Sequence, residues 1–184
     1  MKNIFRRLIV CLLPVFFLLP PVDAAFSATM PAKTVAQPLL LLLFGWMLSS
    51  TLPLHPRASS APSAVIMATL LILFWMIPRS IDLTQIYPSA NALYVLSLFA
   101  AGSLLSLYFP LLPGVARTVY ALHSSSMIVA LGLLYAFQST LLCSAYTLED
   151  QHGSGWMLVS VGVFAYLLVL ASMTRWLAQP AESR

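Results

Sequence analysis

The residues of this sequence that could take part in chemistry lie in a few short stretches. Cys143 precedes the stretch Leu148-Glu-Asp-Gln-His-Gly-Ser-Gly-Trp-Met-Leu158, which places two carboxylates, an amide and an imidazole between apolar runs, and Met76 ends an earlier apolar run. Thiolate, thioether and imidazole groups are the ligands that hold Cu(I). Met76, Cys143 and His152 are therefore candidate copper ligands. Against this site, methionines are common in apolar helices, and one cysteine with one histidine provides few ligands; Cys11 is interpreted as a small apolar residue.

A second candidate is His123, which lies inside an apolar run and is followed by three serines, Ser124 to Ser126. An imidazole in lipid needs a hydrogen-bonding partner. We expect it to bond a neighbouring helix, with the small serines allowing close approach, in preference to binding a ligand. His55 stands beside prolines in a loop on the inner side and is expected to be an ordinary solvated loop residue.

Enzyme motifs are absent from the sequence. It contains no P-loop, no GxGxxG, no HExxH and no GxSxG with triad partners. Cys11 and Cys143 form no CxxC or zinc-type spacing. We therefore expect a non-enzymatic protein without a resident cofactor, in which copper is the one metal to test.

The composition indicates which elements must position these residues. The chain has 184 residues, of which 60% are hydrophobic and 8% charged, and its mean hydropathy is +0.92. So few charges cannot cover a soluble domain. The net charge of +4 comes from single, scattered basic residues, which argues against nucleic acid as a partner. The sequence predicts an all-α, polytopic integral membrane helix bundle surrounded by lipid.

Five apolar runs are long enough to cross about 30 Å of hydrocarbon as helices. We expect a single helical domain at 29–184, with spans at about 35–54, 62–78, 88–109, 117–143 and 155–176. Residues 1–28 combine a basic start, a short apolar run with Pro14 and Pro20-Pro21, and small residues at Ala24 and Ala28. They fit either a cleaved signal peptide or a first membrane helix, and both alternatives stay open.

The distribution of basic residues predicts the orientation. With the C-terminus in the cytoplasm, only Lys33 and Arg79 of the nine basic residues fall outside, as the positive-inside bias requires. The favoured location is the bacterial inner membrane, with Leu148–Leu158 as a periplasmic loop. Glu149 and Asp150 would suit the positive end of the last helix dipole, and Gly153-Ser-Gly155 would let the chain turn into that helix.

Two further expectations concern side chains near the predicted span ends. Arg79 and Asp82 should pair with each other or clamp a neighbouring loop. Trp75, Trp156 and Trp176 should lie at headgroup depth, where amphipathic rings settle.

Two motifs together resemble a known family. Trp75-Met-Ile-Pro78-Arg-Ser-Ile-Asp82 resembles the Trp-His-x-Pro-x-x-x-Asp motif of the CtaG family of cytochrome c oxidase assembly factors. Asp150-Gln151, followed by Gly155, resembles that family's Asp-Gln-x-x-x-Gly stretch. The resemblance covers roughly residues 34 to 176. It implies a polytopic protein that helps to assemble heme-copper oxidases, in a family whose histidines are suspected of handling copper.

The histidines of that family are missing from this chain. Its His-x-x-x-His pair would fall on Thr34 and Pro38, with Gln37 retained, and two further histidines would fall on Met76 and Asn91. The resemblance therefore implies the family's fold without its metal-transfer chemistry, unless Met76, Cys143 and His152 form a substitute soft site. The residues kept from the motifs are structural: Trp75, Pro78, Asp82, Asp150, Gln151 and Gly155.

The predicted function is that of an accessory or assembly factor of a respiratory heme-copper oxidase, acting by helix-helix contact. One alternative is a structural subunit of another membrane complex, which the small residues Ala100 to Ser103 would suit. The other is a small transporter. Transport usually requires intramembrane charges or broken helices, and mid-span polarity is limited here mainly to His123 and its serines.

Overall fold

The computed structural model describes residues 12, 14–51 and 56–178, without the side chains of residues 50, 51 and 174–178. Every regular element in this part of the chain is a helix, which confirms the all-α prediction. The α-helices are α2 (Pro20–Ser27), α3 (Gln37–Thr51), α4 (Ala61–Met76), α5 (Pro78–Ile86), α6 (Pro88–Tyr108), α7 (Gly114–Phe137) and α8 (Leu148–Ala178). Three short elements complete them: the π-helix η1 (Ala32–Ala36) and the 3₁₀ helices η2 (Ala58–Ser60) and η3 (Phe109–Leu111).

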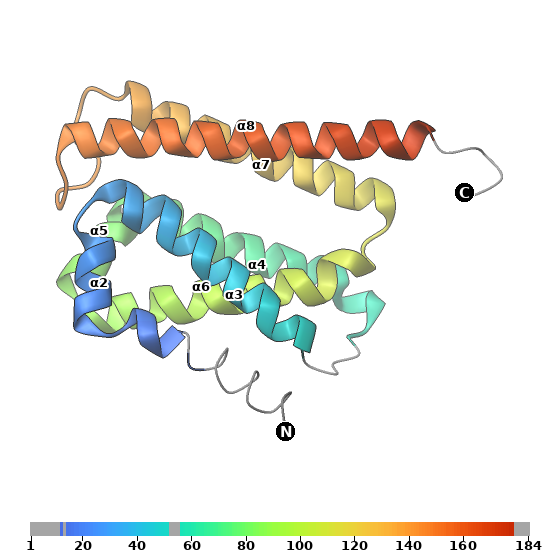
Figure 1. The fold of residues 1–184 in the computed structure, drawn as a ribbon, viewed down its shortest axis with the longest axis horizontal. Coiled ribbons are helices and arrows are strands. Elements are labelled where there is room, and N and C mark those ends of the chain that lie inside the picture. Colours follow the sequence, from blue (N-terminus) through green and yellow to red (C-terminus); the bar gives the residue numbers. More distant parts are fainter. Residues whose placement is uncertain (1–11, 13, 52–55, 179–184) are drawn as a thin grey trace.

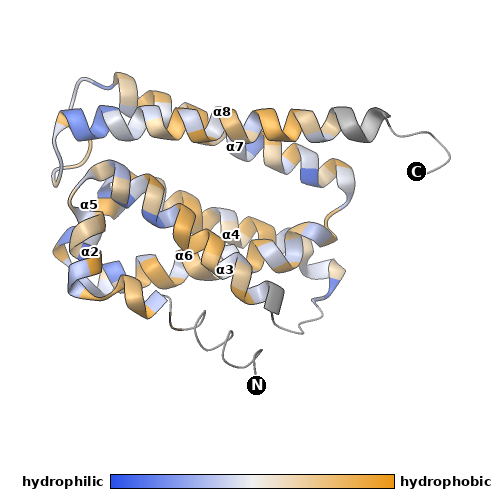
Figure 2. Cartoon of the chain, viewed as in Figure 1, coloured by the Kyte–Doolittle hydropathy of each residue, from blue (hydrophilic) through white to orange (hydrophobic). Residues whose placement is uncertain are grey.

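Five helical segments are long and apolar enough to cross a membrane, as predicted. They are Ala32–Ser49, Ala58–Met76, Pro88–Leu111, Gly114–Phe137 and Leu148–Met173. Large apolar side chains are exposed along them, and Figure 2 shows apolar residues over most of their length. Such surfaces belong in lipid, so the chain is a helical membrane bundle.

The helices form two groups (Figure 1). In one, α7 and α8 lie side by side as a hairpin; in the other, α3, α4 and α6 pack together. At one end of the bundle, α2, α5 and the segment 138–147 cover the helix ends, and we call this the capped end. The opposite end carries the turn between η3 and α7.

Prolines set the helix boundaries at the capped end. Ile77 and Tyr87 are extended, with ψ of 127° and 117°, because each precedes a proline that disfavours helical geometry in the residue before it. Pro78 and Pro88 then stand at the starts of α5 and α6, where a missing N–H costs nothing. This pair of prolines makes α5 a separate short helix, outside the α4 and α6 spans.

The π-turn η1 also has a local cause. Pro38 lies in the first turn of α3, where its ring would crowd the carbonyl of Thr34 in a regular α-helix. The chain instead widens to an i→i−5 pattern, and the N–H of Gln37 donates to the Ala32 carbonyl. The wide turn buries the side chains of Lys33, Thr34 and Val35.

Glycine lets the two principal helix pairs approach closely. A Cβ on Gly132 of α7 would lie 2.7 Å from the backbone nitrogen of Val159 in α8, and one on Gly155 would meet the Gly132 carbonyl oxygen at the same distance. In the other group, a Cβ on Gly102 of α6 would overlap the backbone of Leu42 in α3. Both pairs therefore pack backbone against backbone, as small residues allow in membranes.

The predicted spans need correction at two ends. The fourth ends at Phe137 and not at residue 143, while the last begins at Leu148 and not at 155. The segment 148–158 is therefore helical and not a loop. The prediction that Gly153-Ser-Gly155 turns the chain was wrong as well, because both glycines lie inside α8 and Gly155 packs against α7.

The tryptophans divide between two environments. Trp75 is 4% exposed, contacts Tyr94 edge-on and donates its Nε1–H to Ser97 Oγ at 2.7 Å. The predicted interfacial role was therefore wrong for Trp75, whose ring is covered by the core. Trp156, in the third turn of α8, is exposed, as an interfacial role requires. The side chain of Trp176, like Cys11 and His55, lies outside the described part of the chain.

Candidate functional site at the capped end

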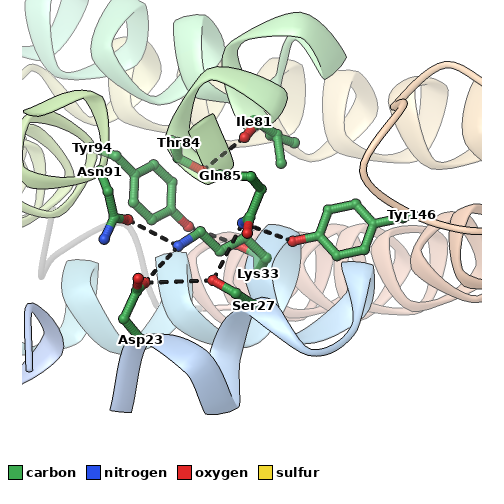
Figure 3. Close-up of polar contacts among 9 residues, drawn as sticks. All are labelled: Asp23, Ser27, Lys33, Ile81, Thr84, Gln85, Asn91, Tyr94 and Tyr146. Carbon is green, nitrogen blue, oxygen red and sulfur yellow. Dashed lines mark hydrogen bonds and ion pairs between the residues drawn. The ribbon is translucent and has the colours of Figure 1, made fainter. Parts of the chain in front are cut away.

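Lys33 is the centre of a buried polar cluster at the capped end (Figure 3). Its side chain is fully buried, and its Nζ donates to Asp23 Oδ1 at 3.0 Å and to Asn91 Oδ1 at 2.9 Å. The same ammonium lies 5.1 Å from the centre of the Tyr94 ring, within the range of a cation-π contact. A carboxylate, an amide and an aromatic face therefore surround one ammonium group.

Three separate elements supply this cluster. The π-turn directs Lys33 into the bundle, and Asp23 comes from the first turn of α2. Asn91 and Tyr94 stand three residues apart on α6, so they share one helix face. The Tyr94 hydroxyl also donates to the Lys33 carbonyl at 2.6 Å, which ties α6 to the widened turn.

The cluster continues towards the segment 138–147. Ser27 Oγ lies 3.5 Å from Asp23 Oδ1, and Gln85 Nε2 donates to Ser27 Oγ at 3.3 Å and to the Tyr146 hydroxyl at 3.0 Å. Burial raises the pKa of Tyr146 above its usual value, so its hydroxyl stays protonated. Asp23 remains 31% exposed, and it connects the buried lysine with the surface.

Gln37 follows Lys33 by four residues and is completely buried. Neither Nε2 nor Oε1 of its side chain has a hydrogen-bond partner among the described residues. A buried amide without partners costs roughly 1–3 kcal/mol. Lys33, whose side chain is hydrogen-bonded, and Gln37, whose side chain is not, therefore lie on neighbouring turns.

Asp82 and Gln151 both hold the segment 138–147. Asp82 accepts hydrogen bonds from the backbone N–H and hydroxyl of Ser144 at 3.0 Å each, and from the N–H of Ala145 at 3.3 Å. Gln151 is fully buried; its Oε1 accepts from the N–H of Leu142 at 2.7 Å. Its Nε2 donates to the carbonyls of residues 138 and 140.

These contacts decide between the two expectations for Asp82. It clamps a neighbouring loop, which confirms the second alternative, and no ion pair joins it to the exposed Arg79 in the described part of the chain. Gln151 performs the same task from the start of α8. Two of the structural motif residues thus fix one segment from opposite sides.

The start of α8 carries the predicted acidic residues in a capping arrangement. Glu149 and Asp150 lie in its first turn. The Asp150 N–H donates to Thr147 Oγ1 at 3.1 Å, and the Thr147 hydroxyl donates to Asp150 Oδ2 at 2.8 Å. Thr147 therefore caps the helix, and the acids complement its dipole. The contribution of Thr147 was missed, although Thr-x-x-Asp before an apolar run is a capping signal.

The candidate copper ligands lie in different surroundings. Cys143 is fully buried, and its thiol donates to the Pro78 carbonyl at 3.4 Å. Burial, with the nearby Asp82 carboxylate, raises the pKa of Cys143 to about 12, which disfavours the thiolate that copper would need. His152 has a ring nitrogen 3.2 Å from the Gln138 carbonyl oxygen.

Met76 stands at the junction of α4 and α5, where its carbonyl accepts from the Tyr135 hydroxyl at 2.8 Å. Among the described residues, no group of three or more His, Cys, Asp or Glu side chains could hold a metal ion. A copper site formed by Met76, Cys143 and His152 stays a prediction.

His123 is not part of the capped end. It is an exposed residue of α7, and the helix-helix hydrogen bond expected through its serines is not formed: Ser125 and Ser126 donate to the carbonyls of Ala121 and Leu122 in their own helix. No described residue forms a hydrogen bond or ion pair with the imidazole.

Sequence reasoning treated Lys33 as an outer charge and did not connect it with Asp23. A signal was available. Between Arg7 and Arg57, Asp23 and Lys33 are the only charged residues, and they have opposite signs. An ionisable residue in an apolar segment is expected to find such a partner. Asn91, 58 residues away, could not be found this way.

Comparisons with known proteins return no match. No family model matches the chain, and neither do the curated proteins or the solved structures.

Proposed function

We propose that this chain is a non-enzymatic accessory or assembly factor of a membrane protein complex, with a respiratory heme-copper oxidase as the favoured partner. We place it in the bacterial inner membrane, with the capped end on the periplasmic side and the C-terminus in the cytoplasm. The partner and the location rest on the motif resemblance and the distribution of basic residues. The mode of action rests on the extensive lipid-facing helix surface.

One observation carries the proposal. The two motifs that resemble the CtaG family are far apart in sequence, yet Asp82 of the first and Gln151 of the second bind the same segment, 138–147. A shared structural purpose explains why both motifs occur in one chain. The segment they hold covers helix ends and offers Ser144 and Ala145 at the surface, where a partner could contact them.

The positions aligned with the family's histidines support an assembly role without metal transfer. Asn91 uses its side-chain oxygen to hold the Lys33 ammonium, and the Thr34 hydroxyl donates to the Met30 carbonyl. Both side chains are thus engaged in hydrogen bonds within the chain. Copper handling, if any, is therefore confined in this proposal to Met76, Cys143 and His152.

The test is purification of a tagged chain from native membranes in mild detergent, followed by heme spectra, protein mass spectrometry and metal analysis. We expect a heme-copper oxidase to co-purify, and oxidase activity to fall when the gene is deleted. Wild-type chain should restore the activity fully. Asp82→Asn should restore less. Arg79→Gln, at an exposed side chain without an ion pair among the described residues, should restore it fully.

A stable stoichiometric complex with a protein other than an oxidase would overturn the favoured partner. The chain would then be a structural subunit of that complex. Normal copper content of the oxidase in the deletion strain would exclude copper handling and leave the assembly role intact.

A further inference from the structure

His123 lies inside the apolar part of α7. At about 1.5 Å per residue, it is roughly 14 Å from the Gly114 end of the span and roughly 21 Å from the Phe137 end. A hydrocarbon core of about 30 Å therefore contains the imidazole. Lipid chains offer no hydrogen bond, and the chain itself supplies none among its described residues.

The face of α7 that carries His123 is suited to close helix contact. Ser126 and Ala130 follow at three and seven residues, so at 100° per residue they share this face with the imidazole. The residues that α7 buries, such as Ser125 and Gly132, lie on the other side of the helix. The exposed face therefore points away from the close contact that Ser125 and Gly132 make with α8, and it begins a small-residue stripe.

A groove runs beside this stripe. It has a volume of about 410 Å³ and lies between α7 and α8, with Ser126 and Ala130 on one wall and Val163, Tyr166 and Leu167 on the other. A passing helix could insert apolar side chains there while its backbone approaches the small residues. The groove and the unpaired imidazole thus belong to one continuous surface.

We propose that this surface binds a second copy of the chain, with His123 paired to His123 across a twofold axis. Two copies inserted in the same sense are related by an axis along the membrane normal, so each residue meets its equivalent at the same depth. A neutral imidazole has one donor and one acceptor nitrogen, and two of them form an N–H···N hydrogen bond without introducing charge into lipid. Symmetry therefore supplies the partner that α7 lacks.

The first experiment is disulfide trapping in native membranes, in a Cys11→Ser background. Cys143 stays, because its thiol is buried. Oxidation should give a covalent dimer with Ser126→Cys or Ala130→Cys. The control Leu70→Cys, on the exposed face of α4, should give none. Absence of the dimer at both α7 positions would overturn the proposal.

The second experiment measures self-association of the purified chain in lipid vesicles by energy transfer between labelled copies. We expect His123→Ala to weaken association roughly 3- to 20-fold, the range of single interhelical hydrogen bonds. His123→Asn should retain it, since an amide both donates and accepts. The control Ser172→Ala should have no effect, because Ser172 bonds the Val169 carbonyl of its own helix and, five residues beyond Leu167, faces away from the groove.

A chain that is monomeric in vesicles, or a His123→Ala variant that associates as well as wild type, contradicts the proposal. Because the vesicles contain no other protein, this result is independent of the partner assigned above.

Discussion

Lys33 and His123 are both ionisable residues in apolar spans, and the protein treats them in opposite ways. Lys33 is fully buried and surrounded by Asp23, Asn91 and the Tyr94 ring (Figure 3). His123 is exposed on α7 and has no hydrogen-bonding partner among the described residues. The α3–α6 group thus pairs its buried ionisable residue internally, whereas the α7–α8 hairpin leaves the imidazole of His123 without a partner among the described residues. Four predictions, the first with a corollary for the N-terminal segment, test this contrast in decreasing order of effect.

Removing the Asp23 carboxylate should cause the largest loss of stability. Asp23→Ala leaves Lys33 buried without a counter-charge, and we expect a loss of about 3 kcal/mol in the free energy of unfolding. The double variant Asp23→Ala/Lys33→Met should recover most of it, because apolar replacement of both partners is nearly neutral. Thermal unfolding in detergent measures both. Equal stability of the single and double variants would contradict a cost of burying Lys33 without its counter-charge.

The same reasoning predicts the fate of the N-terminal segment. Cleavage after Ala24 or Ala28 would remove Asp23 from the chain. Lys33 would then be buried without a counter-charge, as in Asp23→Ala. We therefore expect the mature protein to keep this segment as a helix of the fold. The intact mass of the chain purified from membranes measures this directly. A mass that corresponds to a chain starting beyond residue 23 would contradict it.

The second prediction disrupts the hairpin and leaves the lysine cluster unchanged. In Gly132→Ala, the new Cβ would lie 2.7 Å from the Val159 nitrogen and 2.8 Å from the Gly155 oxygen, so the helices must separate. We expect a loss of about 2 kcal/mol, typical of overpacking, together with weaker self-association. In the control Gly153→Ala, the nearest atom is 3.7 Å away, and stability should be unchanged or slightly higher. Equal melting of the two variants would refute the close backbone contact.

The third prediction concerns Gln37, whose buried amide has no hydrogen-bond partner among the described residues. Gln37→Met removes two unpaired polar atoms and fills the same space, so unfolding should cost about 1–2 kcal/mol more than in the wild type. Chemical denaturation in mixed micelles, with Leu41→Met as an apolar control at an equally buried site, can resolve the change. Destabilisation by Gln37→Met alone would show that the amide binds something in the membrane.

The smallest effect is expected at the clamp of the segment 138–147. Because the pKa of Cys143 is raised to about 12, its thiolate fraction should still increase about tenfold per pH unit between pH 8 and 10, where a free cysteine levels off. Labelling by a small maleimide in a Cys11→Ser chain should follow this slope. Asp82→Asn weakens the bonds to Ser144 and removes a negative charge, so labelling should become faster at every pH. A plateau near pH 9 in the parent chain would contradict the raised pKa.

Sequence reasoning recovered the helical class and the number of spans because these depend on local hydropathy. It failed at Phe137 because residues 138–143 are apolar enough to continue a span. The segment instead folds over the helix ends, with Cys143 buried at Pro78 while Leu141 stays exposed. Hydropathy measures the tendency of a side chain to leave water. It does not distinguish burial in lipid from burial in a protein interior.

The same limit explains the errors at single residues. Trp75 was assigned to the interface because it lies near a span end, but its ring contacts Tyr94 on another helix. For His123, the sequence required a partner and could not tell which way the residue would face. Asp82 and Gln151 were found as motif residues, whereas their common target became visible only when the helix ends were in place.

The ion pair has a consequence for the order in which the chain enters the membrane. Asp23 precedes Lys33 by only ten residues, whereas Asn91 follows it by 58. During synthesis, the first span can therefore be inserted with its lysine already neutralised, long before α6 exists. The carboxylate reduces the cost of moving an ammonium group into lipid at the time when no other helix can share it. Asn91 and Tyr94 then complete the cluster once α6 has been synthesised and packs against α3.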